Sequence, residues 1–219
     1  MFKHYHPYDI FIPEGTTKLI VGTLPPPRFS DGELKKGDVN FCYGSIDGLL
    51  WPVLNAIFDL NLVYETTEKA VNQRKNFLKS RHIGVCDIVD HGFRSKIDAS
   101  DLGLQNVHLR PLIEILEKHP DIDTLIFTGG NSKNGPEYFF RQLLKQYNLK
   151  LKAVRSEVPR IHEFEMHITK RIIKTYSLTA PSGAANRAIG SMALYKQLKQ
   201  SNPDFNTFYF RVMQYREVF

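Results

Sequence analysis

The chain has 219 residues, 42% of them hydrophobic, and a formal net charge of +6, which together permit one sizeable core and a polyanionic partner. Cys42 and Cys86 are its two cysteines and have no CxxC spacing, so neither a disulfide scaffold nor a cysteine-based metal site is indicated. No apolar run approaches the ~20 residues of a membrane span, and the first residues lack the apolar core of a signal peptide. We therefore expect a cytoplasmic protein, nucleoid-associated if bacterial, with a single domain over residues 1–219.

The first half of the chain predicts two strands and two helices. An apolar run predicts a strand over residues 19–21, which meets Gly22 and then three prolines. Apolar residues at helical spacing predict helices over 47–60, with Asp47 as a possible N-cap, and over 67–80. A second apolar run predicts a strand over 83–89, followed by a charged loop over 90–101 that contains Asp98.

The second half continues the alternation. We expect a helix over 107–119, a strand over 123–128 and a helix from Pro136 to residue 147 with Asn134 as its N-cap. Strands are expected over 149–156 and 171–179, joined by a loop that holds His162 and His167. A helix over 185–200 follows, and the aromatic-rich tail over 205–219, helix or strand, should dock on the core.

Strands with continuous apolar cores that alternate with helices predict an α/β fold with a mostly parallel sheet covered on both faces. The loops after Val21, Val89, Phe127 and Leu178 should then meet in one cleft. Neither a nucleotide-binding glycine motif nor a metal-ligand motif is present, so no cofactor and no metal are expected. Small residues, prolines and the single aromatic Tyr43 in these loops suit a pocket for a flat, neutral heterocycle.

Three segments carry a family resemblance. They are Gly22-Thr23-Leu24-Pro25, then Tyr43 with the helix start at Trp51-Pro52, and Pro181-Ser182-Gly183-Ala184-Ala185-Asn186-Arg187. In this order and spacing they resemble the signature motifs of the uracil-DNA glycosylase superfamily, most of all its mismatch-specific and hypoxanthine-DNA glycosylase branches. Residues 84–89 and Ile97-Asp98 resemble the second strand and the following loop of that branch.

The resemblance implies a three-layer α/β/α sandwich with a central, mostly parallel sheet. It also implies a monofunctional DNA glycosylase that flips a deaminated or mispaired base, such as uracil or hypoxanthine, out of DNA and hydrolyses its N-glycosidic bond in base-excision repair. The expected partner is DNA that carries such a base, without a cofactor, a metal or a membrane. We expect the protein to act as a monomer.

Site residues follow from the same likeness. The base pocket would comprise Gly22, Thr23, Leu24, Pro25, Tyr43 and Asn131, with Tyr43 stacked on the flipped base and Asn131 reading a base edge. DNA would contact Pro181, Ser182, Gly183 and Ala184, and Asn186 or Arg187 would bind phosphate near a helix start.

Two positions depart from the family pattern. Leu24 occupies a place where many branches have a water-positioning Asn or Asp, and Gly48 aligns with the asparagine of the hypoxanthine branch. Asp47, next to Gly48, either supplies the catalytic carboxylate, caps the following helix, or does both. The alternative function is a catalytically silent module that binds damaged or single-stranded nucleic acid. A third candidate, a small-molecule hydrolase, would need Ser182 as a nucleophile.

Overall fold

The computed structural model describes residues 1–97 and 101–219, so Asp98 lies outside the described residues. Its main sheet has six strands in the order β3-β2-β6-β9-β8-β7. Four of them run parallel: β3 (Ile83–Asp87), β2 (Lys18–Gly22), β6 (Thr124–Phe127) and β9 (Ile172–Ser177). At one edge, β8 (Arg160–Glu165) and β7 (Lys152–Arg155) extend the sheet antiparallel.

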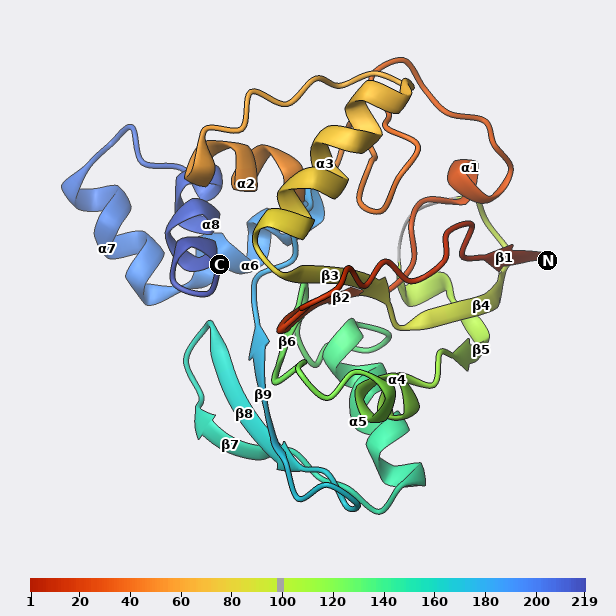
Figure 1. Cartoon of the computed structure of the whole chain (residues 1–219). Coiled ribbons are helices and arrows are strands. Elements are labelled where there is room, and N and C mark those ends of the chain that lie inside the picture. The colour runs from red at the N-terminus through yellow and green to blue at the C-terminus, as the bar shows by residue number, and fades with distance from the viewer. Residues whose placement is uncertain (98–100) are drawn as a thin grey trace.

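Helices cover both faces of this sheet (Figure 1). One face carries α2 (Leu50–Phe58), α3 (Glu68–Ser80) and α8 (Thr207–Arg216), and the other carries α4 (Leu112–Lys118) and α5 (Pro136–Gln146). In β2, Leu19 and Val21 pack toward α4 and α5, whereas Ile20 packs toward α2, α3 and α8. The predicted α/β class with a mostly parallel, two-sided sheet is therefore confirmed, and the arrangement is compatible with a three-layer sandwich.

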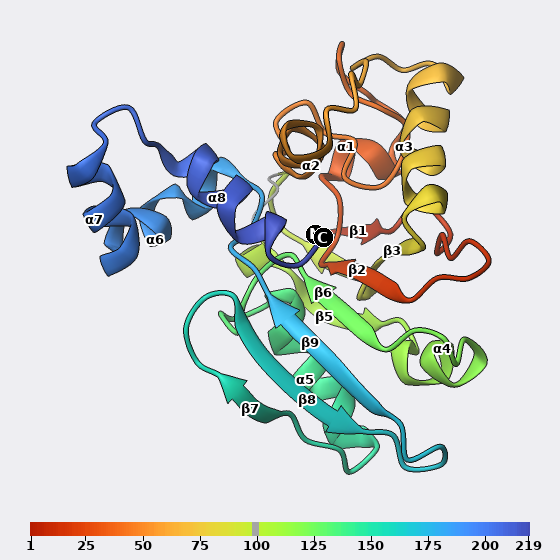
Figure 2. The same ribbon diagram turned by 60° about the vertical axis from the view of Figure 1, so that its left-hand side comes forward.

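A second, smaller sheet lies beside the main one. Its antiparallel order is β1 (Phe2–Tyr5), β4 (Val89–Arg94) and β5 (Gln105–Leu109). The remaining elements are α1 (Pro27–Ser30), α6 (Asn186–Ser191), α7 (Ala193–Ser201) and two short 3₁₀ turns over Asp101–Gly103 and Gly183–Ala185. Figure 2 shows α6 and α7 standing out from the sheet beside α8. No described helix has the length and apolar character needed to cross a bilayer.

Four predicted segments were wrong, three of them because strand pairing overrides local pattern. Val89, expected to end a strand, instead begins β4, and residues 90–94, expected in a loop, continue it. Residues 105–109, partly expected in a helix, form β5 against β4. The expected loop between the last two strands contains β8, in which exposed or half-buried residues alternate with buried ones as in an antiparallel strand with one covered face. The helix expected over 185–200 breaks at Met192, whose backbone is extended.

Helix starts were predicted with mixed success. Thr67 caps α3 by accepting a hydrogen bond from the Ala70 N–H, and the tail forms α8, whose Phe210 and Tyr215 are buried, as expected. Asn134 does not cap α5; it has a φ of +62°, and its amide donates to the Asp101 and Leu104 carbonyls. Asp47 does not cap α2 either, because that helix begins after Leu49 without a side-chain cap.

Candidate active site

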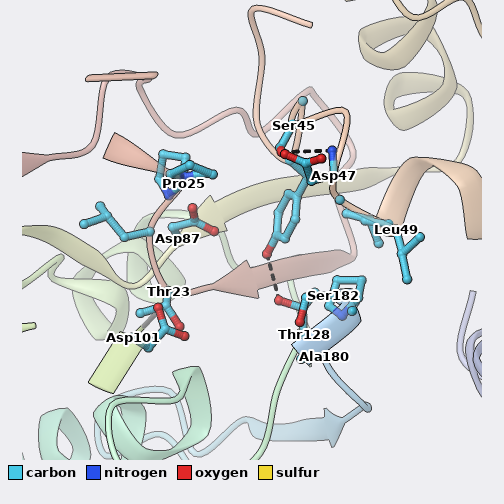
Figure 3. Close-up of a pocket in the computed structure, with 18 of the residues that line it drawn as sticks. Thr23, Pro25, Ser45, Asp47, Leu49, Asp87, Asp101, Thr128, Ala180 and Ser182 are labelled. Carbon is cyan, nitrogen blue, oxygen red and sulfur yellow. Dashed lines mark hydrogen bonds between the residues drawn. The ribbon is translucent and has the colours of Figure 1, made fainter. Parts of the chain in front are cut away.

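The carboxyl ends of the parallel strands lie level with one another. Gly22 stands opposite Asp87, Val21 opposite Phe127, and Phe127 opposite Ser177. A cavity of about 360 Å³ opens at this edge, within the ~300–1,000 Å³ range of small-molecule sites. Its walls include Thr23, Leu24, Pro25, Tyr43, Asp47, Asp87, Asp101, Thr128, Pro181, Ser182 and Gly183 (Figure 3). The loops after β2, β6 and β9 meet at this cavity, as predicted. The loop predicted after Val89 was wrong, because Val89 begins β4, and Asp87 at the end of β3 lines the cavity instead.

The loop that follows β9 is fixed against the loop that precedes α2. The Leu49 N–H donates to the Pro181 carbonyl at 2.8 Å. From α8, the buried Arg211 donates through Nε to the Ala180 carbonyl (3.0 Å) and through its guanidinium to the Ser182 carbonyl (2.6 Å). These bonds satisfy backbone acceptors that lie between elements, so the wall made by residues 180–183 is held in place.

A buried carboxylate organises the opposite wall. Asp38 accepts two hydrogen bonds from Arg28, at 2.7 and 2.9 Å, and one each from the backbone N–H groups of Lys35 and Ile46 at 2.8 Å. Burial alone would raise the pKa of Asp38, but these donors outweigh it and lower the pKa. The loop over 35–46 is therefore anchored around an ionised group.

Tyr43 lies in the pocket wall with a left-handed backbone, φ +57°. Its hydroxyl lies 3.1 Å from Thr128 Oγ1 (dashed in Figure 3), and burial together with the charge of Asp87 raises the pKa of this hydroxyl well above its usual value. A Cβ on Gly22 would lie 2.2 Å from the Tyr43 hydroxyl oxygen and 2.4 Å from Asp87 Oδ1. Glycine at position 22 thus allows Tyr43 and Asp87 to approach the end of β2.

Asp87 is a pocket carboxylate that the sequence analysis missed. Only 5% of the residue is exposed, its Oδ2 lies 3.0 Å from His6 Nε2, and its Oδ1 has no hydrogen-bond partner among the described residues. A buried carboxylate oxygen without a partner is costly unless a ligand or water meets it. The available signal was a lone charge at the end of the apolar run 83–87, where α/β proteins place site residues.

Asp101 is the second carboxylate that was missed. It enters the pocket from the 3₁₀ turn after the small sheet's β4, and Figure 3 shows it beside Thr23. Burial raises its pKa to about 7, although a hydrogen bond from Thr23 and the charge of Arg94 act in the opposite direction. A carboxyl with such a pKa exchanges its proton near neutral pH, as acid–base catalysis requires.

Asp47, the predicted catalytic residue, lies on the rim. Its side chain is 68% exposed and lies 3.5 Å from the Arg28 guanidinium and 3.7 Å from Lys35 Nζ. Ser45 accepts its backbone N–H at 3.2 Å. Asp47 therefore contributes to the pocket mouth, and a role in catalysis remains a prediction.

The structure separates the other predicted residues. Asn131 is not in the base pocket, because the chain turns away after Thr128; it is exposed and lines two neighbouring hollows. Pro181, Ser182 and Gly183 do line the pocket, whereas Ala184, Asn186 and Arg187 are exposed just beyond it.

Two other kinds of site, a serine hydrolase site and a metal site, lack their usual groups within residues 1–97 and 101–219. No histidine from these residues lines the pocket, so Ser182 lacks a neighbouring imidazole base there. The same residues hold no group of three metal-ligating side chains. No protein-family model matches the chain, and no curated protein matches it.

Proposed function

We propose that the protein is a monofunctional DNA glycosylase with a uracil-DNA glycosylase-like fold, which removes a deaminated or mispaired base. The observation that carries the proposal is the pairing of two different carboxylates, Asp87 and Asp101, in one pocket at the strand ends. Residues 23–25 and 181–183 of the resembling segments line that same pocket, and Gly22 lies just outside its lining, at the end of β2.

The pocket suits a nucleobase that has been flipped out of the stack. The Tyr43 ring offers an aromatic face, and the hydroxyls of Tyr43 and Thr128 offer hydrogen bonds to polar edges. Extrusion of a base costs a few kcal/mol, and less for a mispaired one, so a preformed pocket favours damaged positions. The exposed residues beyond Gly183 lie where the sugar-phosphate chain would leave the pocket.

The carboxylates divide the chemistry between them. In the reaction, water oxygen bonds to the anomeric carbon, the bond from that carbon to the base nitrogen breaks, and its electron pair leaves with the base. Asp101, with a pKa of about 7, accepts the proton of the attacking water. The departing base anion takes up a proton from solvent, and Asp101 returns its proton to solvent, so the products are the neutral base and an abasic sugar. The charge of Asp87 stabilises the positive charge that develops on the sugar.

The two carboxylates would compensate for the two positions, Leu24 and Gly48, at which the chain departs from the family pattern. Leu24 and Gly48 provide no polar side chain, which by itself favours a silent binding module. Asp87 and Asp101 supply the missing groups from other parts of the chain, inside the same cavity. We therefore prefer the enzyme.

The test is a glycosylase assay on labelled oligonucleotides that carry uracil, hypoxanthine, xanthine or a G·T mispair, single- and double-stranded, followed by alkaline cleavage of abasic sites. We expect release from at least one substrate and its loss in Asp101→Asn. Salt-sensitive binding without release from any substrate would instead identify a binding module. If Asp47→Asn lowered the rate of base release more than Asp101→Asn did, Asp47 would be the catalytic residue.

A further inference from the structure

Three hollows follow one another along the surface that begins at the pocket. The pocket shares Ala180 with a second hollow of about 490 Å³, which in turn shares Asn131 with a third of about 580 Å³. The second lies over the loop after β6, the end of β9 and the start of β8, and the third lies along α5. They form a continuous path of shared residues.

The charge of the lining changes sign along this path. Asp47, Asp87 and Asp101 line the first pocket, whereas among the described residues no acidic side chain lines the second or third hollow. Arg160 lines the second, and Arg141, Lys145 and Lys150 line the third. The path therefore leads from an acidic pocket onto a basic surface.

The two arginines are held rigidly. Glu137, 1% exposed, lies beneath them and accepts hydrogen bonds from Arg160 at 3.0 Å and from Arg141 at 2.8 Å. Burial alone would raise the pKa of Glu137, but Ser177, Arg141 and Arg160 outweigh it and lower the pKa. Arg141 also contacts His162 Nε2 at 3.0 Å, and burial lowers the pKa of that histidine. One carboxylate against two guanidinium groups leaves a net positive charge.

The absence of a side chain at Gly130 leaves room for the Arg160 guanidinium. A Cβ on Gly130 would lie 2.2 Å from the Arg160 guanidinium, so glycine there lets Arg160 lie across the end of β6. Arg160 still has 31% of its side chain exposed, and it lines the hollow rather than being enclosed. A guanidinium fixed by a buried carboxylate and open on one side is suited to bind a phosphate.

We propose that these two hollows form a phosphate track that holds the DNA backbone on one side of the flipped nucleotide. Arg160 and Asn131 would bind the phosphodiester nearest the pocket, and Arg141, Lys145 and Lys150 those beyond it. The proposal rests on the proposed function, because it takes the pocket as the place of the base. It reassigns Asn131 from the base edge to the backbone.

The test uses Lys145→Gln/Lys150→Gln, since both lysines are exposed and their side chains make no hydrogen bond or ion pair with described residues. The matched control is Lys69→Gln/Lys79→Gln on α3, which removes the same charge from exposed positions outside all three hollows. Binding is measured against salt with single- and double-stranded oligonucleotides that carry a tetrahydrofuran abasic-site analogue.

Each lost phosphate contact lowers the slope of log affinity against log salt by ~0.7 for single strands and ~0.9 for duplexes. We expect the track variant to lose about 1.4–1.8 in slope relative to the control, so that its binding weakens most at low salt. Arg160→Gln should lower the slope by a further ~0.7–0.9, and Arg160→Lys should restore it. Thermal unfolding of each variant shows whether the fold is kept.

Equal slopes in track and control variants would overturn the track. The track would also be overturned if Arg160→Gln left the salt dependence of DNA binding unchanged and only stopped inorganic phosphate from competing with DNA. The hollow would then be a small-anion site. Base release with unchanged slopes would leave the glycosylase standing without the track. A lowered slope without base release would leave the track standing on a protein that only binds DNA.

Discussion

The pocket and the phosphate track have opposite charge patterns. In each region the group of opposite charge is paired with a neighbouring side chain. In the pocket, Arg28 is the one basic side chain among the described lining residues, and it is paired with the buried Asp38 at 2.7 Å. Beneath the track, the carboxylate of Glu137 is buried below two arginines. What each region presents to a ligand is therefore of one sign. The difference separates the groups suited to break a bond from those suited to hold a polyanion.

The largest expected effect comes from removing the acid–base group. Asp101→Asn should lower the rate of base release about 10²- to 10⁴-fold, since the amide cannot accept the proton of water. In the parent protein, kcat/KM should rise with pH and level off above an apparent pKa of about 7. In the variant this dependence should vanish. A parent profile that falls through pH 7 would mean that Asp101 acts as an acid.

A methyl group at Gly22 should damage the pocket without changing its charge. In Gly22→Ala the new Cβ collides with Tyr43 and Asp87, so we expect base release to fall roughly tenfold or more and the free energy of unfolding to fall by about 1–3 kcal/mol. Gly190→Ala on α6 is the matched control, because a Cβ there meets nothing within 4 Å and Gly190 lies outside the pocket lining. Similar losses in both variants, in the release assay and in denaturant unfolding, would refute the steric argument.

Asp47→Asn should have a smaller effect than either. Its exposed carboxylate forms surface ion pairs, which contribute ~0–1 kcal/mol, so base release should fall by less than about tenfold. Because both are single carboxylate-to-amide changes at the same pocket, Asp47→Asn and Asp101→Asn compare the rim directly with the interior in one release assay.

The last prediction concerns stability rather than activity. The folded state raises the pKa of Asp101, so its contribution to stability is fully present below the unfolded pKa near 4 and is lost as pH rises through about 7. Asp101→Asn should match the parent near pH 4 and exceed it at pH 8 by up to about 4 kcal/mol, since one pKa unit corresponds to about 1.4 kcal/mol, and its melting temperature should be higher there. Melting curves across this range would show it; a gap that narrows with pH would contradict the sign.

The sequence predicted the frame of the site better than its chemistry. The run 19–21 and the breaks at Gly22 and Pro181 identified two pocket walls, because apolar runs and backbone-restricted residues act locally. Asp101 carries no local signal, since its position depends on β4 and β5, strands that the pattern did not reveal. Asn131 was misplaced because the direction of a chain after a strand depends on tertiary packing. Glu137 offered no hint that it would lie beneath Arg160.

The pocket wall depends on residues that are far apart along the chain. Tyr215 donates to the Thr179 carbonyl at 2.9 Å, Arg211 holds residues 180–182, and Lys18 donates to the Val218 carbonyl 200 residues away. Contacts of such long sequence separation carry a high loop-closure entropy and slow the steps that form them. We expect the pocket to be completed late in folding, after β2 and α8 have come into contact. A chain in which residues 180–183 are not yet held by α8 would therefore be incompletely folded.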